Sequence, residues 1–151
     1  MDGRLKFEDF PVGKVMEFGD TLVTLEEMMV FSRRFDPQTF HVDEAAARGS
    51  MFGGLIASGW HTCAMAMRMY VDGVIGQADS QGSPGLENVR WVKPVRAGDR
   101  LRLRIEVMEA RPSGSKPHLG LIRNFWQVLN QRDEVVLEMN GWSILRRRVA
   151  A

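Results

Sequence analysis

The chain has 151 residues, 44% of them hydrophobic and 26% charged, and these values favour a single globular domain over residues 1–151 with a core that needs no metal. Twenty Lys and Arg residues against nineteen Asp and Glu residues give a formal net charge of +1, which excludes a strong overall attraction to nucleic acid. A single cysteine, Cys63, excludes an intrachain disulfide and a cysteine-based metal site.

The first six residues, Met-Asp-Gly-Arg-Leu-Lys, carry charges where a signal peptide needs an apolar segment, so we expect a cytoplasmic protein. The most apolar stretch, Trp60–Ile75, is interrupted by Arg68 and Asp72 and is too short to cross a bilayer. We therefore expect no membrane partner and interpret this stretch as a buried helix.

A first helix is predicted to begin after Thr24, because Thr24 and Glu27 have the spacing of a capping box. Apolar residues then recur at helical spacing: Met28, Phe31 and Phe35. Pro37 ends this pattern, so Asp36 is expected just beyond the end of the helix.

A second helix is predicted over Trp60–Ile75, with Ser58 as its N-cap. Its apolar residues recur at steps of three and four: Trp60, Cys63, Ala64, Met67, Val71 and Ile75. Further apolar residues lie on its other sides: Met65, Ala66, Met69 and Val74. A helix that is apolar around most of its circumference must be covered by other parts of the protein, and a curved sheet can supply that cover.

Strands are predicted in the second half of the chain, where four apolar residues alternate with charged ones: Leu101, Leu103, Ile105 and Val107. The other candidate strands are residues 89–95, 119–129 and 134–145, and polar residues 130–133 predict a hairpin between the last two. Helices followed by strands indicate an α+β fold. We expect a hot-dog domain, in which an antiparallel sheet wraps around a long central apolar helix.

Asp36 and His41 are the candidate catalytic pair, because they lie five residues apart across a turn that contains proline. A carboxylate and an imidazole that converge can hold a water molecule between them and exchange protons with it. The residues alone leave a structural alternative, in which Asp36 caps a turn and His41 packs against the loop.

The candidate substrate-binding residue is Gly59, at the end of the segment Gly53-Gly-Leu-Ile-Ala-Ser-Gly59 that leads into the apolar helix. Free backbone amides at a helix N-terminus can bind the carbonyl oxygen of a thioester and stabilise an enolate. A glycine would let the ligand approach closely. The alternative is a glycine that is required only for a tight turn.

Four segments together carry a family resemblance: Asp36 with His41 and Asp43, the Leu55–Gly59 run, the turn Pro94–Leu101, and the lead Phe7–Gly13. They resemble the MaoC-like acyl dehydratases, the family that includes the (R)-specific enoyl-CoA hydratases. The sequence departs from many relatives at Gln38 and Thr39, and Met67 stands roughly where some hydratases have a serine.

The resemblance implies a hydro-lyase that reversibly hydrates a 2-enoyl-CoA to a (3R)-hydroxyacyl-CoA. Asp36 and His41 would act on the water, and the amide of Gly59 would bind the thioester oxygen. No metal or other cofactor is implied, since coenzyme A is part of the substrate. The resemblance also implies a homodimer or higher homo-oligomer, with sheets joined edge to edge and an acyl tunnel along the subunit boundary.

Two alternative functions stay open. A hot-dog acyl-CoA thioesterase usually carries its acid on the central helix, where this sequence offers only Asp72, near the end of the helix. A non-catalytic acyl-thioester binding module commonly lacks one member of the catalytic pair, whereas this chain has both Asp36 and His41.

Overall fold

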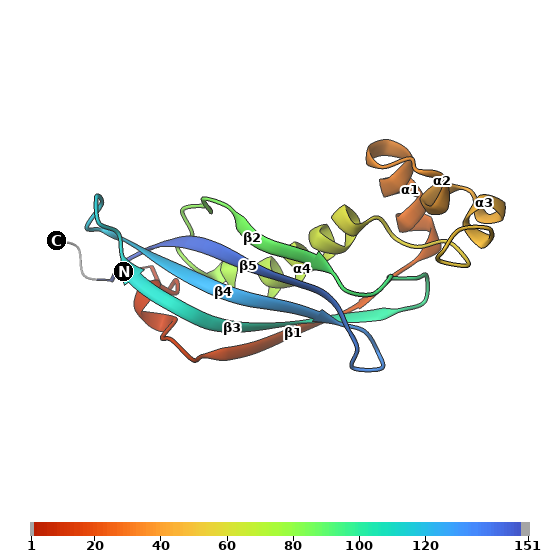
Figure 1. The fold of residues 1–151 in the computed structure, drawn as a ribbon. Helices are drawn as coiled ribbons and strands as arrows, with labels where there is room; N and C mark the ends of the chain where they lie inside the picture. The colour runs from red at the N-terminus through yellow and green to blue at the C-terminus, as the bar shows by residue number, and fades with distance from the viewer. Residues whose placement is uncertain (1, 149–151) are drawn as a thin grey trace.

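The computed structural model describes residues 2–148, in which an antiparallel sheet lies against a long helix (Figure 1). The strands are β1 (Val15–Leu22), β2 (Leu86–Trp91), β3 (Arg100–Pro112), β4 (Leu119–Leu129) and β5 (Val135–Arg146). The helices are α1 (Leu25–Phe35), α2 (Thr39–Val42), α3 (Glu44–Arg48) and α4 (Gly59–Gly73), with 3₁₀ turns at Phe7–Asp9 and Ile75–Gln77. The strand order β1-β3-β4-β5-β2 places β1 and β2 at the two edges. This is the predicted α+β arrangement, with an antiparallel sheet packed against a long central helix.

The core lies between the sheet and α4. The four alternating residues predicted to face inward from β3 are each at most 1% exposed: Leu101, Leu103, Ile105 and Val107. Residues of α4 that pack into the same core are Met65, Ala66, Met69 and Tyr70. The period-two pattern therefore predicted the inner face of β3 correctly.

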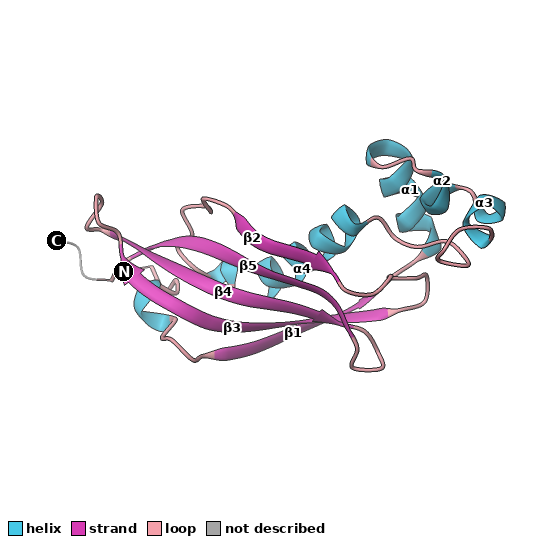
Figure 2. Cartoon of the chain, in the orientation of Figure 1, coloured by secondary structure: helices cyan, strands magenta, loops and turns pink. Residues whose placement is uncertain are grey.

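The predicted first helix is confirmed as α1. The Thr24 hydroxyl accepts a hydrogen bond of 3.2 Å from the Glu27 amide, and Asp36 follows the last helical residue. Helices α2 and α3 were not predicted, because four and five residues are too few to show a helical period. Figure 2 shows α1, α2 and α3 beyond one end of the sheet, near the start of α4.

Two predicted elements have other boundaries in the structure. Helix α4 runs over Gly59–Gly73 and not to Ile75; Ser58 is its N-cap residue, as predicted, but the hydroxyl makes no capping hydrogen bond. The strand predicted over residues 89–95 is β2 at residues 86–91, after which the chain leaves the sheet before Pro94. The amides of Val92 and Lys93 both donate to the carbonyl oxygen of Val136, so the regular ladder ends there, and Pro94, which has no N–H, cannot resume it.

The sheet covers only one side of α4. Three apolar residues on the outer side of the helix stay exposed: Trp60 (63%), Met67 (48%) and Val71 (39%). The prediction of a helix wrapped on most sides is therefore only partly met by this chain alone. Within residues 2–148, none of the helices is long and apolar enough to cross a membrane.

Candidate active site

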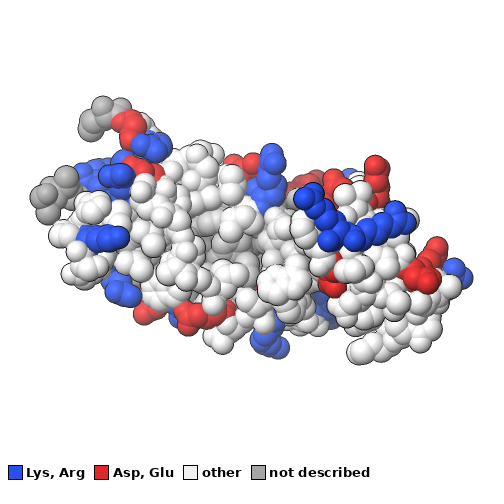
Figure 3. Space-filling view, turned by 90° about the horizontal axis from the view of Figure 1, so that it is seen from above, with Lys and Arg blue, Asp and Glu red and all other residues white. Residues whose placement is uncertain are grey.

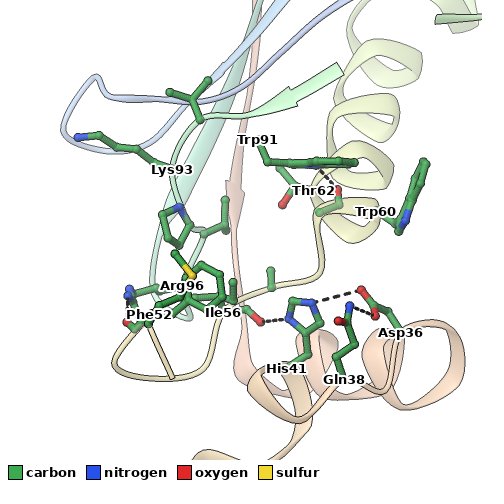
Figure 4. Close-up of a pocket in the computed structure, with 16 residues that line it drawn as sticks. Asp36, Gln38, His41, Phe52, Ile56, Trp60, Thr62, Trp91, Lys93 and Arg96 are labelled. Carbon is green, nitrogen blue, oxygen red and sulfur yellow. Dashed lines mark hydrogen bonds and ion pairs between the residues drawn. The ribbon is translucent and has the colours of Figure 1, made fainter. Parts of the chain in front are cut away.

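A cavity of about 620 Å³ lies between α2, the N-terminus of α4 and the segment that follows β2 (Figure 4). Polar side chains in its wall are Asp36, Gln38, His41, Thr62, Lys93 and Arg96. Aromatic residues in its wall are Phe52, Trp60 and Trp91. The cavity thus combines a titratable pair with a largely apolar surround, the usual make-up of a small-molecule site.

The structure brings Asp36 and His41 together. Nε2 of His41 lies 3.2 Å from Oδ2 of Asp36, and the imidazole is buried. Nδ1 of His41 lies 2.8 Å from the carbonyl oxygen of Ile56, which can only accept a hydrogen bond. Nδ1 therefore carries a proton, and Nε2 is the nitrogen that can exchange a proton with Asp36 or with a bound ligand.

Three neighbours stabilise the Asp36 carboxylate. The Ser58 hydroxyl donates to Oδ2 at 2.7 Å, and the Gln38 side-chain amide donates to Oδ1 at 2.8 Å. Burial opposes ionisation of Asp36, but the hydrogen bonds from Ser58 and Gln38 and the adjacent His41 outweigh it and lower the pKa of the carboxyl below its ordinary value. Asp36 is therefore an anion at neutral pH.

The local fold explains why these side chains meet. Asp36 stands at the C-terminus of α1, the chain turns at Pro37, and α2 then carries His41 back toward Asp36. Asp43, the third residue of the motif, lies elsewhere: its carboxylate accepts a hydrogen bond of 3.1 Å from the Ala46 amide and caps α3.

Gly59 is the first residue of α4 and lines the cavity. In residues 2–148, no acceptor for its backbone N–H is found, so this amide is open to a ligand. The reason for glycine differs from the one expected. A Cβ built on Gly59 would overlap Cε2, Nε1 and Cδ2 of Trp91, so the absent side chain makes room for the indole.

Sequence reasoning missed Ser58, Gln38 and Trp91 as site residues. Ser58 was interpreted as a helix cap because it precedes an apolar helical pattern, and its side chain instead donates to Asp36. Met67, the residue compared with a serine of some hydratases, is 48% exposed on α4 and does not line the cavity. The serine beside the carboxylate is Ser58.

The two basic residues of the cavity lie across it from Asp36 (Figure 4). Lys93 pairs with Glu134, and Arg96 donates to the carbonyl oxygen of Phe52. Among residues 2–148, no three His, Cys, Asp or Glu side chains are grouped closely enough to hold a metal ion.

Comparisons with known proteins agree with one another. A family model described as "MaoC like domain" matches residues 9–124. The uncharacterised protein YdeM of Bacillus subtilis (strain 168) is 29% identical over 134 residues, covering 89% of this chain and 94% of YdeM. The crystal structure of a MaoC-like dehydratase from Rhodospirillum rubrum is 38% identical, with a TM-score of 0.90 over 97% of this chain and 99% of that chain.

A more distant structure shares the fold. The R-hydratase PhaJ1 of Pseudomonas aeruginosa is 20% identical to this chain, with a TM-score of 0.72 over 98% of this chain and 93% of PhaJ1.

Proposed function

The chain belongs to the family of MaoC-like domains, and from this premise we propose that it is a hydro-lyase that reversibly adds water to a 2-enoyl-CoA and forms a (3R)-hydroxyacyl-CoA. One observation carries the proposal. Asp36 and His41, 3.2 Å apart, face the same cavity as the open amide of Gly59. Water addition to an α,β-unsaturated thioester needs both parts, because one handles protons while the other holds the enolate oxygen.

The ionised state of Asp36 supports its role as the base. As water attacks C3, the pair accepts one proton from the water, and charge develops on the thioester oxygen near the Gly59 amide. The pair then delivers a proton to C2, so that its own protonation is the same before and after turnover. Dehydration is the same path in reverse. Because the oxidation state of the substrate does not change overall, the reaction needs no redox cofactor, and coenzyme A enters as part of the substrate.

The thioesterase alternative loses support from the position of Asp72. Its side chain is 59% exposed near the end of α4 and pairs with Arg68 at 2.8 Å. It is not among the residues that line the cavity with Asp36 and His41. An acid held by Arg68 on the outer surface cannot activate water in that cavity.

The proposed activity is tested by following the ultraviolet absorbance of the enoyl thioester while thiol release is measured in the same sample. Enoyl-CoA substrates of about four to twelve carbons form the panel, so that the length of apolar chain to be buried varies. We expect absorbance loss without thiol release. Thiol release would instead identify a thioesterase, and binding without either change would identify a binding module.

We also infer that two copies pair through β2 and the exposed side of α4. Strand β2 is an edge of the sheet, and its free N–H and C=O groups can extend the ladder into a second sheet. In Figure 1, β2 lies on the upper side of the sheet. Figure 3 shows the molecule from above, and the central part of this face is largely uncharged. Trp60 on α4 and Trp91 on β2 are 63% and 46% exposed and also line the cavity, so the acyl chain would run along the subunit boundary.

A further inference from the structure

Strand β2 has one more residue than the stretch of β5 that it faces. Glu87 pairs with Asn140 and Arg90 pairs with Glu138, with a register shift between the two pairs. Asn88 and Val89 therefore stand opposite the single residue Met139, which is the arrangement of a β-bulge. Asn88 has φ of 55°, a left-handed conformation that few residues other than glycine adopt.

The bulge reverses the alternation of side chains along β2. Glu87 accepts a hydrogen bond from the Trp142 indole, and Arg90 contacts Glu138 at 3.3 Å. These contacts put Glu87 and Arg90 on the same, outer face, although residues three apart in an unbroken strand point to opposite faces. Trp91, next to Arg90, therefore points inward to α4. Without the extra residue it would share the outer face with Glu87.

Trp91 makes two contacts with Gly59. Its indole Nε1–H donates a hydrogen bond of 2.9 Å to the Gly59 carbonyl oxygen. Its ring fills the space that a Cβ of Gly59 would occupy. Trp60 packs edge-on against Trp91: the centroids of the two rings are 5.6 Å apart, and the interplanar angle is 72°.

We propose that Trp91 is a positioning residue, aimed by the β2 bulge, that fixes the first peptide groups of α4 so that the Gly59 amide points into the cavity. The inference rests on the proposed function, because it gives the Gly59 amide a role in catalysis. Glycine has wide backbone freedom, and the N–H of a first helical residue has no partner within its helix to restrain it. Electrostatic stabilisation of an oxyanion requires donors that are already in place before charge develops. Trp91 supplies that restraint through its hydrogen bond to the Gly59 carbonyl oxygen and through the ring that packs where a Cβ would be.

The test compares Trp91→Phe with Trp142→Phe. Trp91→Phe keeps an aromatic ring over Gly59 and removes the indole N–H donor. Trp142→Phe is the matched control, since it removes an indole hydrogen bond to the same strand on the outer face. With crotonyl-CoA we expect Trp91→Phe to lower kcat at least tenfold and to change KM less than threefold, while Trp142→Phe stays within twofold of wild type in both. A merely structural role of Trp91 would lower the thermal midpoint without this separation of kcat from KM.

A second measurement does not depend on turnover. In ¹⁵N-labelled protein, we expect the Trp91 indole N–H to exchange with solvent more slowly than that of exposed Trp60, and the Gly59 amide signal to broaden or split in Trp91→Phe but not in Trp142→Phe. An unchanged Gly59 signal in Trp91→Phe would overturn the inference, whatever the activity. If the Gly59 signal responds as expected but wild type hydrates no enoyl-CoA, the positioning contact stands and the proposed reaction fails.

Discussion

The Ser58 hydroxyl donates a hydrogen bond of 2.7 Å to Oδ2 of Asp36, the same oxygen that lies 3.2 Å from Nε2 of His41. Removal of this donor in Ser58→Ala makes the carboxylate less stable, so the pKa of Asp36 should rise. Because the carboxylate is the active form, the acid limb of the kcat/KM profile should move to higher pH by about one unit, the equivalent of one hydrogen bond to a charged group, while the carboxylate stays ionised at neutral pH. A pH–rate profile of both proteins measures the shift, and an acid limb that stays in place or moves to lower pH would contradict it.

Substitution of either member of the pair should abolish most activity without unfolding the protein. We expect Asp36→Asn and His41→Ala each to lower the hydration rate by at least about a hundredfold, as for general acid–base groups. Asp43→Asn is the control: asparagine caps a helix as well as aspartate, so the cap of α3 and the activity should both persist. Steady-state kinetics measure the rates, and circular dichroism checks that each variant is folded. A wild-type rate in Asp36→Asn or His41→Ala would remove the substituted residue from the mechanism.

The sequence predicted those parts of the fold and site that depend on periodic or closely spaced residues. Alternation marked the inner face of β3, and the Thr24 cap and Pro37 placed Asp36 at a helix end, near His41. Contacts between distant segments gave no such signal. Ser58 reaches Asp36 across 22 positions, and Trp91 reaches Gly59 across 32, so both depend on how the chain folds back. A one-residue bulge also reverses the face of a side chain, which an alternating pattern cannot anticipate.

Dimerisation should depend on the exposed side of α4. Met67, 48% exposed in the middle of that side, would meet the partner copy in the proposed dimer. Met67→Glu would bury an unpaired charge there and should shift the protein toward monomer at micromolar concentration. Val30→Glu, at a residue 64% exposed on α1, is the control and should leave the oligomer intact. Multi-angle light scattering measures both variants. A wild type that is monomeric throughout would rule out the dimer.

The bulge makes the stability of β2 sensitive to the residue at position 88. Asn88→Gly should be tolerated or slightly stabilising, because glycine adopts a φ of 55° without steric cost. Asn88→Val places a β-branched side chain in that conformation and should destabilise the fold by about 1–3 kcal/mol. Urea unfolding at constant m-value measures the difference. Equal stability of the two variants would show that the left-handed conformation at Asn88 is not needed.

Gly59 and Trp91 should be energetically coupled, because the indole occupies the place of the missing Cβ. Gly59→Ala in the wild-type background forces the methyl group against the ring and should destabilise the protein by about 1–3 kcal/mol, as overpacking does. Trp91→Ala removes the ring, and in that background the same methyl group meets no such obstacle. We therefore expect the two losses to be non-additive, with an interaction free energy of at least about 1 kcal/mol from a double-mutant cycle in urea. Additive losses would mean that glycine serves ligand approach or a turn and not the indole.

An enzyme assay tests the role of the Gly59 amide separately. Gly59→Pro deletes the amide donor and should abolish turnover even in the Trp91→Ala background, where no clash with the ring is left. Because Gly59→Ala/Trp91→Ala retains the amide donor that Gly59→Pro/Trp91→Ala lacks, its residual activity should be the higher of the two, and the reverse order would remove the Gly59 amide from the reaction.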